Sequence, residues 1–307
     1  MNIVTSIHAY NFHLFISYLG KGIRIFPFND FRKSFYKTNA IYPREISHNK
    51  SLQEIITTKH ILLGVNNSDI SSFELNQNIH SKIDKSIINQ FKANQLSLDY
   101  NYNDLYILTE EQGIVNLDFK NPYKSKILDK IIPKSFEELG EPIVSNMISI
   151  DKSILLSIRG FGVSKIEKTS KEETYRSEDA QDVLFYKKEQ IIIVADGIEG
   201  LVIFKCREKK PEIKLPLPNY DIPQEIKHFY NHVLIKGKNG LYLLNLNTNK
   251  FRVIMEGGVG AFTQYYNYIF YSSNSQIHLL VSSEKGLSEF TLYDEKELDI
   301  KRNKYLR

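Results

Sequence analysis

Residues 191–204 read IIIVADGIEGLVIF, two short apolar runs joined by turn residues that include Asp196, Gly197 and Gly200. Short apolar runs rich in Ile and Val and separated by Gly and Asp are typical of β-strands connected by a tight turn. Weaker copies of the same pattern occur along almost the whole chain. The stretch therefore predicts a repeating strand-turn-strand unit, and this repeat decides the fold class.

One turn residue marks each copy of the repeat: the residue at the start of the second of the two joined strands. These residues are Gly22, Asp69, Gly113, Gly162, Gly200, Gly240 and Gln276. Successive markers are roughly 36 to 49 residues apart and about 42 on average, which is the length of a four-stranded propeller blade. Seven such units account for nearly all of the 307 residues.

Each unit predicts a first strand that begins with a polar residue and a buried, apolar second strand. A short turn and a third strand of alternating polar and apolar residues follow. The second strands are predicted at 14–18, 61–65, 105–109, 154–158, 191–195, 233–236 and 268–272. The third strands are predicted at 22–27, 70–75, 113–119, 162–166, 201–205, 241–246 and 276–281. Helical patterning is confined to the short polar segments 134–139 and 295–307.

Radial packing is the arrangement that these units favour. One four-stranded sheet cannot bury both of its faces, whereas a ring of sheets gives every face a neighbour. The first and last units are as apolar as the middle ones, so we expect a closed ring rather than a capped stack. The sequence therefore predicts an all-β, seven-bladed β-propeller of about 42-residue repeats. It forms one domain over residues 1–294, followed by a polar tail at 295–307, and how the ring closes is not predicted.

Two units resemble a known repeat family. The segment Val194–Phe204, preceded by Ala180–Val183, is similar to an LVIVD repeat, and so is Leu105–Thr109 with Gly113–Phe119 and then Asn121-Pro122 after it. The resemblance implies a β-propeller of the kind found in bacterial surface or secreted proteins, and it brings no catalytic motif. WD40 repeats share the period, but the Gly-His and Trp-Asp signatures are missing and the chain contains no Trp.

Composition excludes several classes of protein. The net charge of +4 comes from 40 basic and 36 acidic residues without a long block of either sign, which argues against a nucleic-acid partner. Cys206 is the only cysteine, so no intrachain disulfide can form. No apolar stretch is long enough for a membrane span, and no signal peptide is evident. The expected location is therefore cytoplasmic as the sequence stands, or secreted or cell-surface if a signal peptide has been removed.

One polar position recurs at the predicted mouth of the central channel, where the first strand of each blade begins. Its occupants are Ser6, Gln53, Ser97, Asn146, Asp182 and Glu225, with Ala261 in the last unit. A ring of this kind could hold water, an ion or a polar group of a ligand. The alternative is that the channel is hydrated and these side chains satisfy one another.

The turns on the same face carry a second set of candidates, chosen as contacts for a protein partner. They are Lys21, Asp69, Glu110, Arg159, Asp196, Glu199 and Lys238. The signs of these charges alternate, which does not favour strong steering of a charged ligand. Turn chemistry alone also accounts for Gly, Asn and Asp at such positions.

Motifs for catalysis and metal binding are weak. Asp196–Glu199 resembles half of a calcium loop but lacks its alternating oxygen ligands, and His228 and His232 do not share a face on a strand-turn-strand segment. No nucleophile elbow is present. The aromatic run 265–271 is predicted to pack between blades, with an exposed binding patch as the alternative.

These patterns predict a non-catalytic protein-interaction module that binds a protein partner through one face of the propeller. No catalytic residue, metal or cofactor is assigned, and the oligomeric state is not predicted. The alternative is a small-ligand binder or a hydrolase- or lyase-type enzyme with a site at the channel mouth, where Asp182 and Glu225 would supply the carboxylates.

Overall fold

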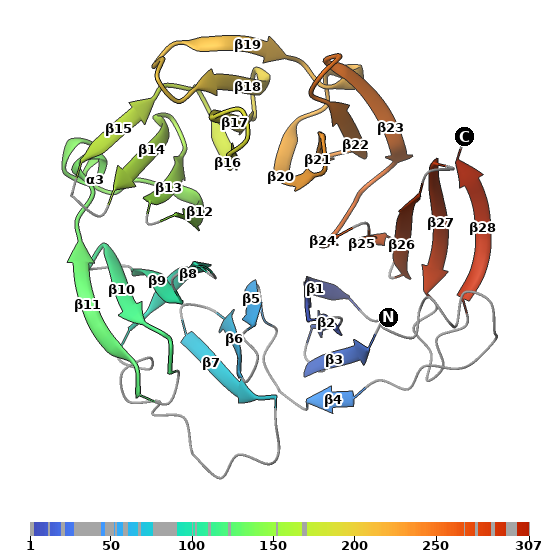
Figure 1. The fold of residues 1–307 in the computed structure, drawn as a ribbon, viewed down its shortest axis with the longest axis horizontal. Coiled ribbons are helices and arrows are strands. Elements are labelled where there is room, and N and C mark those ends of the chain that lie inside the picture. Colours follow the sequence, from blue (N-terminus) through green and yellow to red (C-terminus); the bar gives the residue numbers. More distant parts are fainter. Residues whose placement is uncertain are drawn as a thin grey trace. The chain divides into compact units, whose positions relative to one another are not determined.

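The computed structural model shows an all-β, seven-bladed β-propeller, as the repeat predicts (Figure 1). It describes the chain except residues 1–2, 12, 20–21, 28–43, 47–51, 53, 58–60, 67–68, 76–90, 100, 102, 110–111, 122–123, 152, 168–170, 267, 274–275, 284–285, 293–299 and 307. The chain divides into two compact units, residues 1–66 with 258–307 and residues 67–257.

The seven sheets follow one another along the chain, and within each sheet consecutive strands pair antiparallel. Sheets 1 and 2 contain β1 (Val4–Tyr10), β2 (His13–Tyr18), β3 (Gly22–Pro27) and β4 (Arg44–Ile46), then β5 (Glu54–Thr57), β6 (Ile61–Asn66) and β7 (Asp69–Glu74). Sheets 3 and 4 contain β8 (Ala93–Asp99), β9 (Asp104–Thr109), β10 (Ile114–Asp118) and β11 (Lys126–Ile131), then β12 (Val144–Ile150), β13 (Ser153–Ile158), β14 (Gly162–Glu167) and β15 (Glu172–Tyr175).

Sheets 5 and 6 contain β16 (Ala180–Tyr186), β17 (Ile191–Asp196), β18 (Gly200–Lys205) and β19 (Pro211–Leu215), then β20 (Pro223–Phe229), β21 (His232–Gly237), β22 (Gly240–Asn245) and β23 (Lys250–Glu256). Sheet 7 contains β24 (Phe262–Tyr265), β25 (Tyr268–Ser273), β26 (Gln276–Ser283), β27 (Gly286–Leu292) and β28 (Ile300–Leu306). A short helix, α3 (Lys134–Leu139), and a 3-10 turn, η2 (Pro218–Tyr220), complete the described elements. The predicted second and third strands of all seven units are confirmed to within a residue or two.

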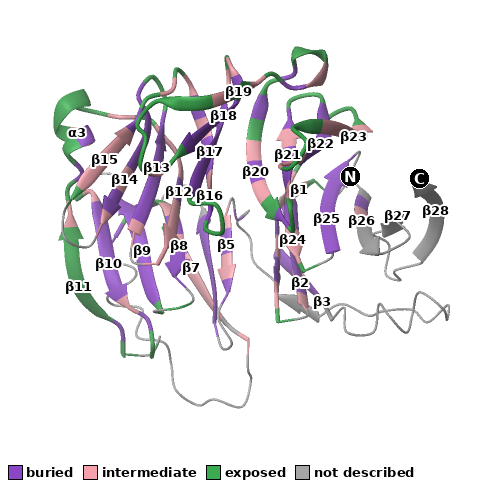
Figure 2. Cartoon of the chain, turned by 45° about the horizontal axis from the view of Figure 1, so that its top comes forward, coloured by how far each residue is buried: buried purple, intermediate pink, exposed green. Residues whose placement is uncertain are grey.

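The second strands are apolar because both of their faces are covered. Every residue of β9, β17 and β25 is buried. Strands enclosed on both faces read as continuous apolar runs rather than alternating ones. The outer strands β11 and β19 are mostly exposed, which explains their polar sequences (Figure 2).

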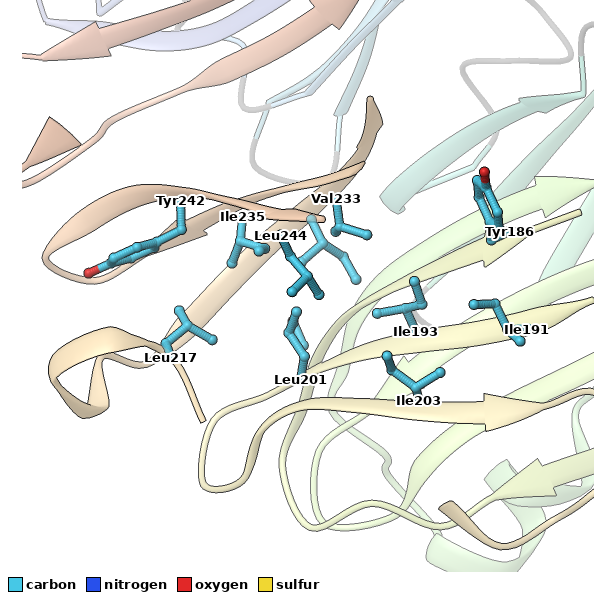
Figure 3. Close-up of a cluster of buried hydrophobic side chains, with 12 residues drawn as sticks. Tyr186, Ile191, Ile193, Leu201, Ile203, Leu217, Val233, Ile235, Tyr242 and Leu244 are labelled. Atoms are coloured by element: carbon cyan, nitrogen blue, oxygen red, sulfur yellow. The ribbon is translucent and has the colours of Figure 1, made fainter. Parts of the chain in front are cut away.

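Neighbouring blades within residues 67–257 pack through their apolar faces. The cluster between blades 5 and 6 joins Ile193 and Leu201 to Ile235 and Leu244 (Figure 3). Burial of these branched side chains contributes roughly 1.5 to 3 kcal/mol each. The first strands β8, β12, β16 and β20 are the innermost strands of blades 3 to 6 (Figure 1), so side chains on neighbouring first strands can interact.

The first and last blades meet directly in the other unit. Ile7 and Ile16 of blade 1 share one buried cluster with Phe270 and Leu279 of blade 7. Among the strands that the structure describes, β1 pairs only within its own sheet, and none is shared between these two sheets. Side-chain packing therefore joins the two ends of the repeat. Of the aromatic run, Tyr268, Phe270 and Tyr271 lie in the core as expected, whereas Tyr266 is exposed.

The boundary predicted at residue 294 is wrong. Residues 300–306 form β28, which pairs with β27 and extends the last sheet to five strands. The segment looked like a separate polar tail because it contains Lys301, Arg302 and Lys304. In general, a strand at the edge of a sheet tolerates charged residues. The short helical pattern at 134–139 is confirmed as α3.

Gly200 shows why glycine recurs at the start of the third strand. Its φ is +88°, a left-handed conformation that disfavours residues with a side chain. A Cβ placed on Gly200 would lie 2.4 Å from the carbonyl oxygen of Leu215, where the fourth strand crosses the turn. The repeat marker is therefore required by the backbone of the blade. No helix in the described part of the chain is long and apolar enough to cross a membrane.

Candidate functional site

One end of blades 4 to 6 carries most of the predicted site residues, and we call it the turn face. It consists of the turns 159–161, 197–199 and 238–239 and of the segments that enter the first strands, 141–143, 177–179 and 218–222. Arg159, Glu199 and Lys238, three of the predicted contact residues, lie on it. Asp69 is exposed at the start of β7, while Lys21 and Glu110 lie outside the described residues.

The strand register assigns the predicted channel-mouth position to Gln95 in the third blade rather than to Ser97. Asn146, Asp182 and Glu225 each pair with the penultimate residue of the second strand, and so does Gln95. The turn between β8 and β9 contains four residues, whereas the corresponding turn of blade 4 contains two. Counting the same number of residues back from the second strand therefore reaches Ser97 instead of Gln95. Because strand side chains alternate with a period of two, Ser97 still points to the same face as Gln95.

Ser6 of blade 1 occupies this same register position in the other unit. Gln53 lies outside the described residues, and the register assigns the position in blade 2 to Glu54, which pairs with Val65. Ser97 has a different role, since its hydroxyl lies 2.9 Å from that of Ser149 on the next blade.

The channel-mouth side chains of blades 3 to 5 bind the next blade. Gln95 Nε2 donates to the carbonyl oxygen of Ser145 at 2.7 Å. Asn146 Nδ2 donates to Asp182 Oδ1, and Asp182 Oδ2 accepts from the backbone N–H of Ile226 at 2.7 Å. Each of these three side chains therefore hydrogen-bonds to the next blade, while the buried Oε1 of Gln95 has no hydrogen-bond partner among the described residues.

Asp182 is the most perturbed carboxyl group at this end. Burial raises the pKa of Asp182 to about 7, and repulsion from Glu225 adds to the effect of burial. Hydrogen bonds from Ile226 and Asn146, together with the charge of Lys227, act in the opposite direction. Asp182 is almost fully buried, and its two oxygens accept three hydrogen bonds, including one from the N–H of Val183.

Glu225 is engaged as well. Its carboxylate lies 2.9 Å from Lys227 Nζ and 3.8 Å from Lys236 Nζ. General acid–base catalysis needs a group within hydrogen-bond reach of a substrate. Both carboxylates of the enzymatic alternative already have partners within the protein. Among the residues that the structure describes, no group of three or more His, Cys, Asp and Glu side chains could hold a metal ion.

Asp196 was predicted as a contact residue, and this prediction is wrong because its side chain is completely buried. Its carboxylate accepts hydrogen bonds from the N–H groups of Ile198, Glu199 and Asp179 and from the hydroxyl of Ser177. Burial would raise the pKa of Asp196, but these donors outweigh burial and hold the pKa below its usual value. The half calcium loop is thus a side-chain clip that fixes the turn.

Asp221 forms the corresponding clip in blade 6 from the opposite direction. It precedes β20 and accepts from the backbone N–H of Asn239 at 2.9 Å, from Asn239 Nδ2 at 3.0 Å and from Tyr242 Oη at 2.8 Å. In blade 5 the carboxylate comes from the end of the second strand, whereas here it comes from the segment entering the first strand. No repeat marker in the sequence identifies Asp221, because the two clips occupy different positions in their blades.

The Tyr242 hydroxyl can be tested separately from its ring. We expect Tyr242→Phe to lower the free energy of unfolding by about 1.5 to 3 kcal/mol, because it removes a buried hydrogen bond to a carboxylate. Tyr186→Phe is the matched control, since Tyr186 belongs to the same cluster (Figure 3) and the structure records no hydrogen bond of its hydroxyl to any described residue. Urea unfolding of both variants measures the difference, and equal losses would show that Asp221 does not depend on the Tyr242 hydroxyl.

Sequence reasoning missed the exposed apolar residues of the turn face. Tyr220 is 89% exposed, Ile198 70%, Ile143 65% and Ile222 41%. The only sequence signal is their placement, since each is an apolar residue in a turn or entry segment otherwise rich in Gly, Pro, Asn and Asp. A strand-based pattern cannot separate such residues from the apolar strands around them.

These residues are linked along the face by hydrogen bonds. The N–H of Arg159 donates to the carbonyl of Ile143, and Arg159 Nη2 donates to Gln181 Oε1 at 2.9 Å. Gln181 Nε2 donates to Asp179 Oδ2, and the carbonyl of Asp179 accepts from the N–H of Gly197, next to Ile198. The turn face of blades 4 and 5 is therefore one connected surface.

The same surface continues into blade 6. A Cβ on Gly200 would lie 2.7 Å from the Cα of Pro216, so the blade 5 turn touches the segment that leads to Tyr220. The N–H of Lys238 donates to the carbonyl of Ile222 at 2.9 Å. Ile143 and Ile222 hold the same position in their blades. In each case the carbonyl oxygen accepts a hydrogen bond from the N–H of a basic residue, Arg159 or Lys238. Ile3 of blade 1 holds this position in the other unit and is also exposed.

Comparison with known proteins supports the fold and does not identify a family. No family model matches the chain, and no curated protein matches its sequence. The β-propeller domain of Cps50 (Swd1) from Myceliophthora thermophila is similar in structure, with a TM-score of 0.66, 11% identity and coverage of 92% of this chain and 99% of that one. The Neurospora crassa Pan2 WD40 domain gives a TM-score of 0.59 and 8% identity, covering 89% of this chain and 86% of that one.

An extracellular domain of a hybrid two-component system from B. thetaiotaomicron is similar too, with a TM-score of 0.64 and 17% identity. The match covers 88% of this chain but only 38% of that longer chain. At these identities the likeness shows the propeller fold alone. The LVIVD resemblance is not supported by a family match.

Proposed function

We propose that the chain is a non-catalytic protein-interaction module that binds a protein partner through the turn face of blades 4 to 6. The observation that carries the proposal is the row of exposed apolar side chains at Ile143, Ile198, Tyr220 and Ile222. Single exposed apolar residues are ordinary, whereas a connected set at one end of a rigid scaffold is typical of an interaction site.

The rigidity of the turns supports the same proposal. Asp196 and Asp221 fix the turns that carry Ile198 and Tyr220 by accepting several hydrogen bonds each. A surface that is already ordered loses little conformational entropy when a partner binds. The mixed polar rim formed by Arg159, Gln181 and Lys238 is also the composition expected around an apolar interface centre.

The enzymatic alternative has less support. It requires Asp182 and Glu225 to be available to a ligand at the channel mouth. Asp182 is buried and accepts three hydrogen bonds, and Glu225 is paired with two lysines. These carboxylates connect the blades, so the proposal assigns them a structural role.

Site-specific photocrosslinking tests the proposal. A benzophenone amino acid is introduced at Ile198 on the turn face and, as a matched control, at Tyr230, which is exposed in the hairpin at the opposite end of blade 6. In cells that naturally contain the protein, we expect a protein adduct at position 198 and none at position 230, identified by mass spectrometry. Equal labelling at both positions, or no protein adduct at 198, would contradict the proposal.

A further inference from the structure

The loop that carries Tyr220 is strained. Asn219 and Tyr220 have φ values of 58° and 52°, so two successive residues with side chains adopt the left-handed conformation. This conformation costs free energy for residues other than glycine, and a bulky aromatic residue adopts it rarely. Tyr220 nevertheless projects almost fully into solvent, so burial of its own ring does not offset the cost.

Hairpin geometry explains the other left-handed side chains but not this pair. Among the described residues, the remaining non-glycine positions with positive φ all lie in turns that join two paired strands; they are Asn11, Asn103, Asp151, Gln190, Tyr230, Asn249 and Tyr266. Tight hairpins require positive φ for the twist of their strands. The loop between β19 and β20 connects two different blades and has no such requirement.

The loop is held in this conformation from both ends. Leu217 points into the cluster that contains Leu201 and Tyr242 (Figure 3). Four residues later, Asp221 accepts hydrogen bonds from Asn239 and Tyr242. Between these two anchors the chain makes a compact turn that contains Tyr220. Strain that persists only because its surroundings impose it is concentrated at functional sites.

We propose that Tyr220 is the anchor residue of the protein interface and inserts into an apolar pocket of the partner. This inference rests on the proposed function and specifies its central contact. Tyrosine is one of the residues that dominate binding energy at protein interfaces, because it combines a large apolar ring with a polar tip. A ring that is already fixed outside the surface needs no ordering when the pocket closes around it.

The basic side chains of blades 5 and 6 indicate the charge at the rim of the partner's pocket. Lys214 and Lys236 are paired with Glu199 and Glu225, respectively. Lys238 is exposed, lies next to Ile222 through its main-chain hydrogen bond, and makes no ion pair with any described residue. The occupant is therefore a protein whose apolar pocket carries a carboxylate at the edge that faces Lys238.

Tyr220→Gly separates binding from folding. Glycine adopts positive φ without strain, so we expect the urea midpoint of this variant to equal or exceed that of the wild type. The partner identified by crosslinking at position 198 is purified and titrated by calorimetry. We expect Tyr220→Gly to weaken its binding about thirtyfold or more, as removal of a central aromatic anchor does. Tyr220→Phe, which keeps the ring, is expected to retain most of the affinity.

Two further variants complete the test. Tyr230→Gly relieves the same left-handed strain at the opposite end of blade 6, and its affinity should equal that of the wild type. Lys238→Glu should weaken binding more at low salt than at high salt, because screening reduces the new repulsion. Unchanged affinity of Tyr220→Gly for the partner would overturn the anchor while leaving the proposed function intact. Absence of any crosslinked protein at position 198 would overturn both.

Discussion

Gly200→Ala is expected to lower the free energy of unfolding by about 2 to 5 kcal/mol. The left-handed φ of +88° accounts for about 1 to 2 kcal/mol of this loss. The rest comes from the added methyl group, which would lie 2.4 Å from the carbonyl oxygen of Leu215 and 2.7 Å from the Cα of Pro216. Both neighbours are backbone atoms, so the fourth strand must move to relieve the overlap, and overpacking of this kind costs about 1 to 3 kcal/mol.

Gly160→Ala separates the two contributions. Gly160 also has positive φ, +71°, but a Cβ at that position meets nothing within 4 Å. Its replacement should therefore cost only the conformational part, about 1 to 2 kcal/mol. Urea unfolding of both variants at one pH provides the comparison. Equal losses would mean that the crossing of the fourth strand over Gly200 does not constrain the turn.

The contribution of Asp182 to stability is expected to depend on pH with a sign opposite to that of an ordinary surface carboxylate. In the folded protein its pKa is about 7, whereas in the unfolded chain an aspartate titrates near 4. Between these values folding takes up a proton, so stability rises as the pH falls through 7 and the gain is complete near pH 4. Between pH 8 and pH 5 the gain should be about 2 to 3 kcal/mol.

The comparison with Asp182→Asn isolates this effect, because asparagine carries no charge at any pH. The stability difference between wild type and variant should shift toward the wild type by about 2 to 3 kcal/mol on going from pH 8 to pH 5. Asp196→Asn is the control. The pKa of Asp196 is lowered in the folded protein, so its carboxyl group is ionised over this pH range in both the folded and the unfolded protein. A difference for Asp182→Asn that does not change with pH would show that Asp182 stays ionised between the blades.

Much of the fold can be predicted from the sequence because the repeat reports burial directly. Strands enclosed on both faces, such as β9 and β17, must be continuously apolar, and the glycine that opens the third strand is required by its backbone conformation. The C-terminal strand β28 escapes this logic. An edge strand has a weaker requirement for apolar residues, so its charged sequence resembles a tail.

The candidate site was predictable only in part. Position along a strand places Asn146, Asp182 and Glu225 at the same end of their blades, but Ser97 shows that a two-residue change in turn length defeats such a count. Charge and turn chemistry suggested Asp196 as a surface contact, although the structure buries it. Whether a carboxylate faces solvent or clips a turn depends on donors from other segments, such as Ser177 and Asp179.

The sequence by itself determined the class of fold, the number of blades and the positions of most strands, because local periodicity and turn glycines express the geometry of each blade. Tertiary structure alone decided which polar groups are buried and hydrogen-bonded within the protein and which side chains are exposed to solvent. Tyr220 illustrates the division. Its exposure follows from Leu217 and Asp221, which anchor the loop to blade 6 through contacts with Tyr242, a residue more than twenty positions away in the chain.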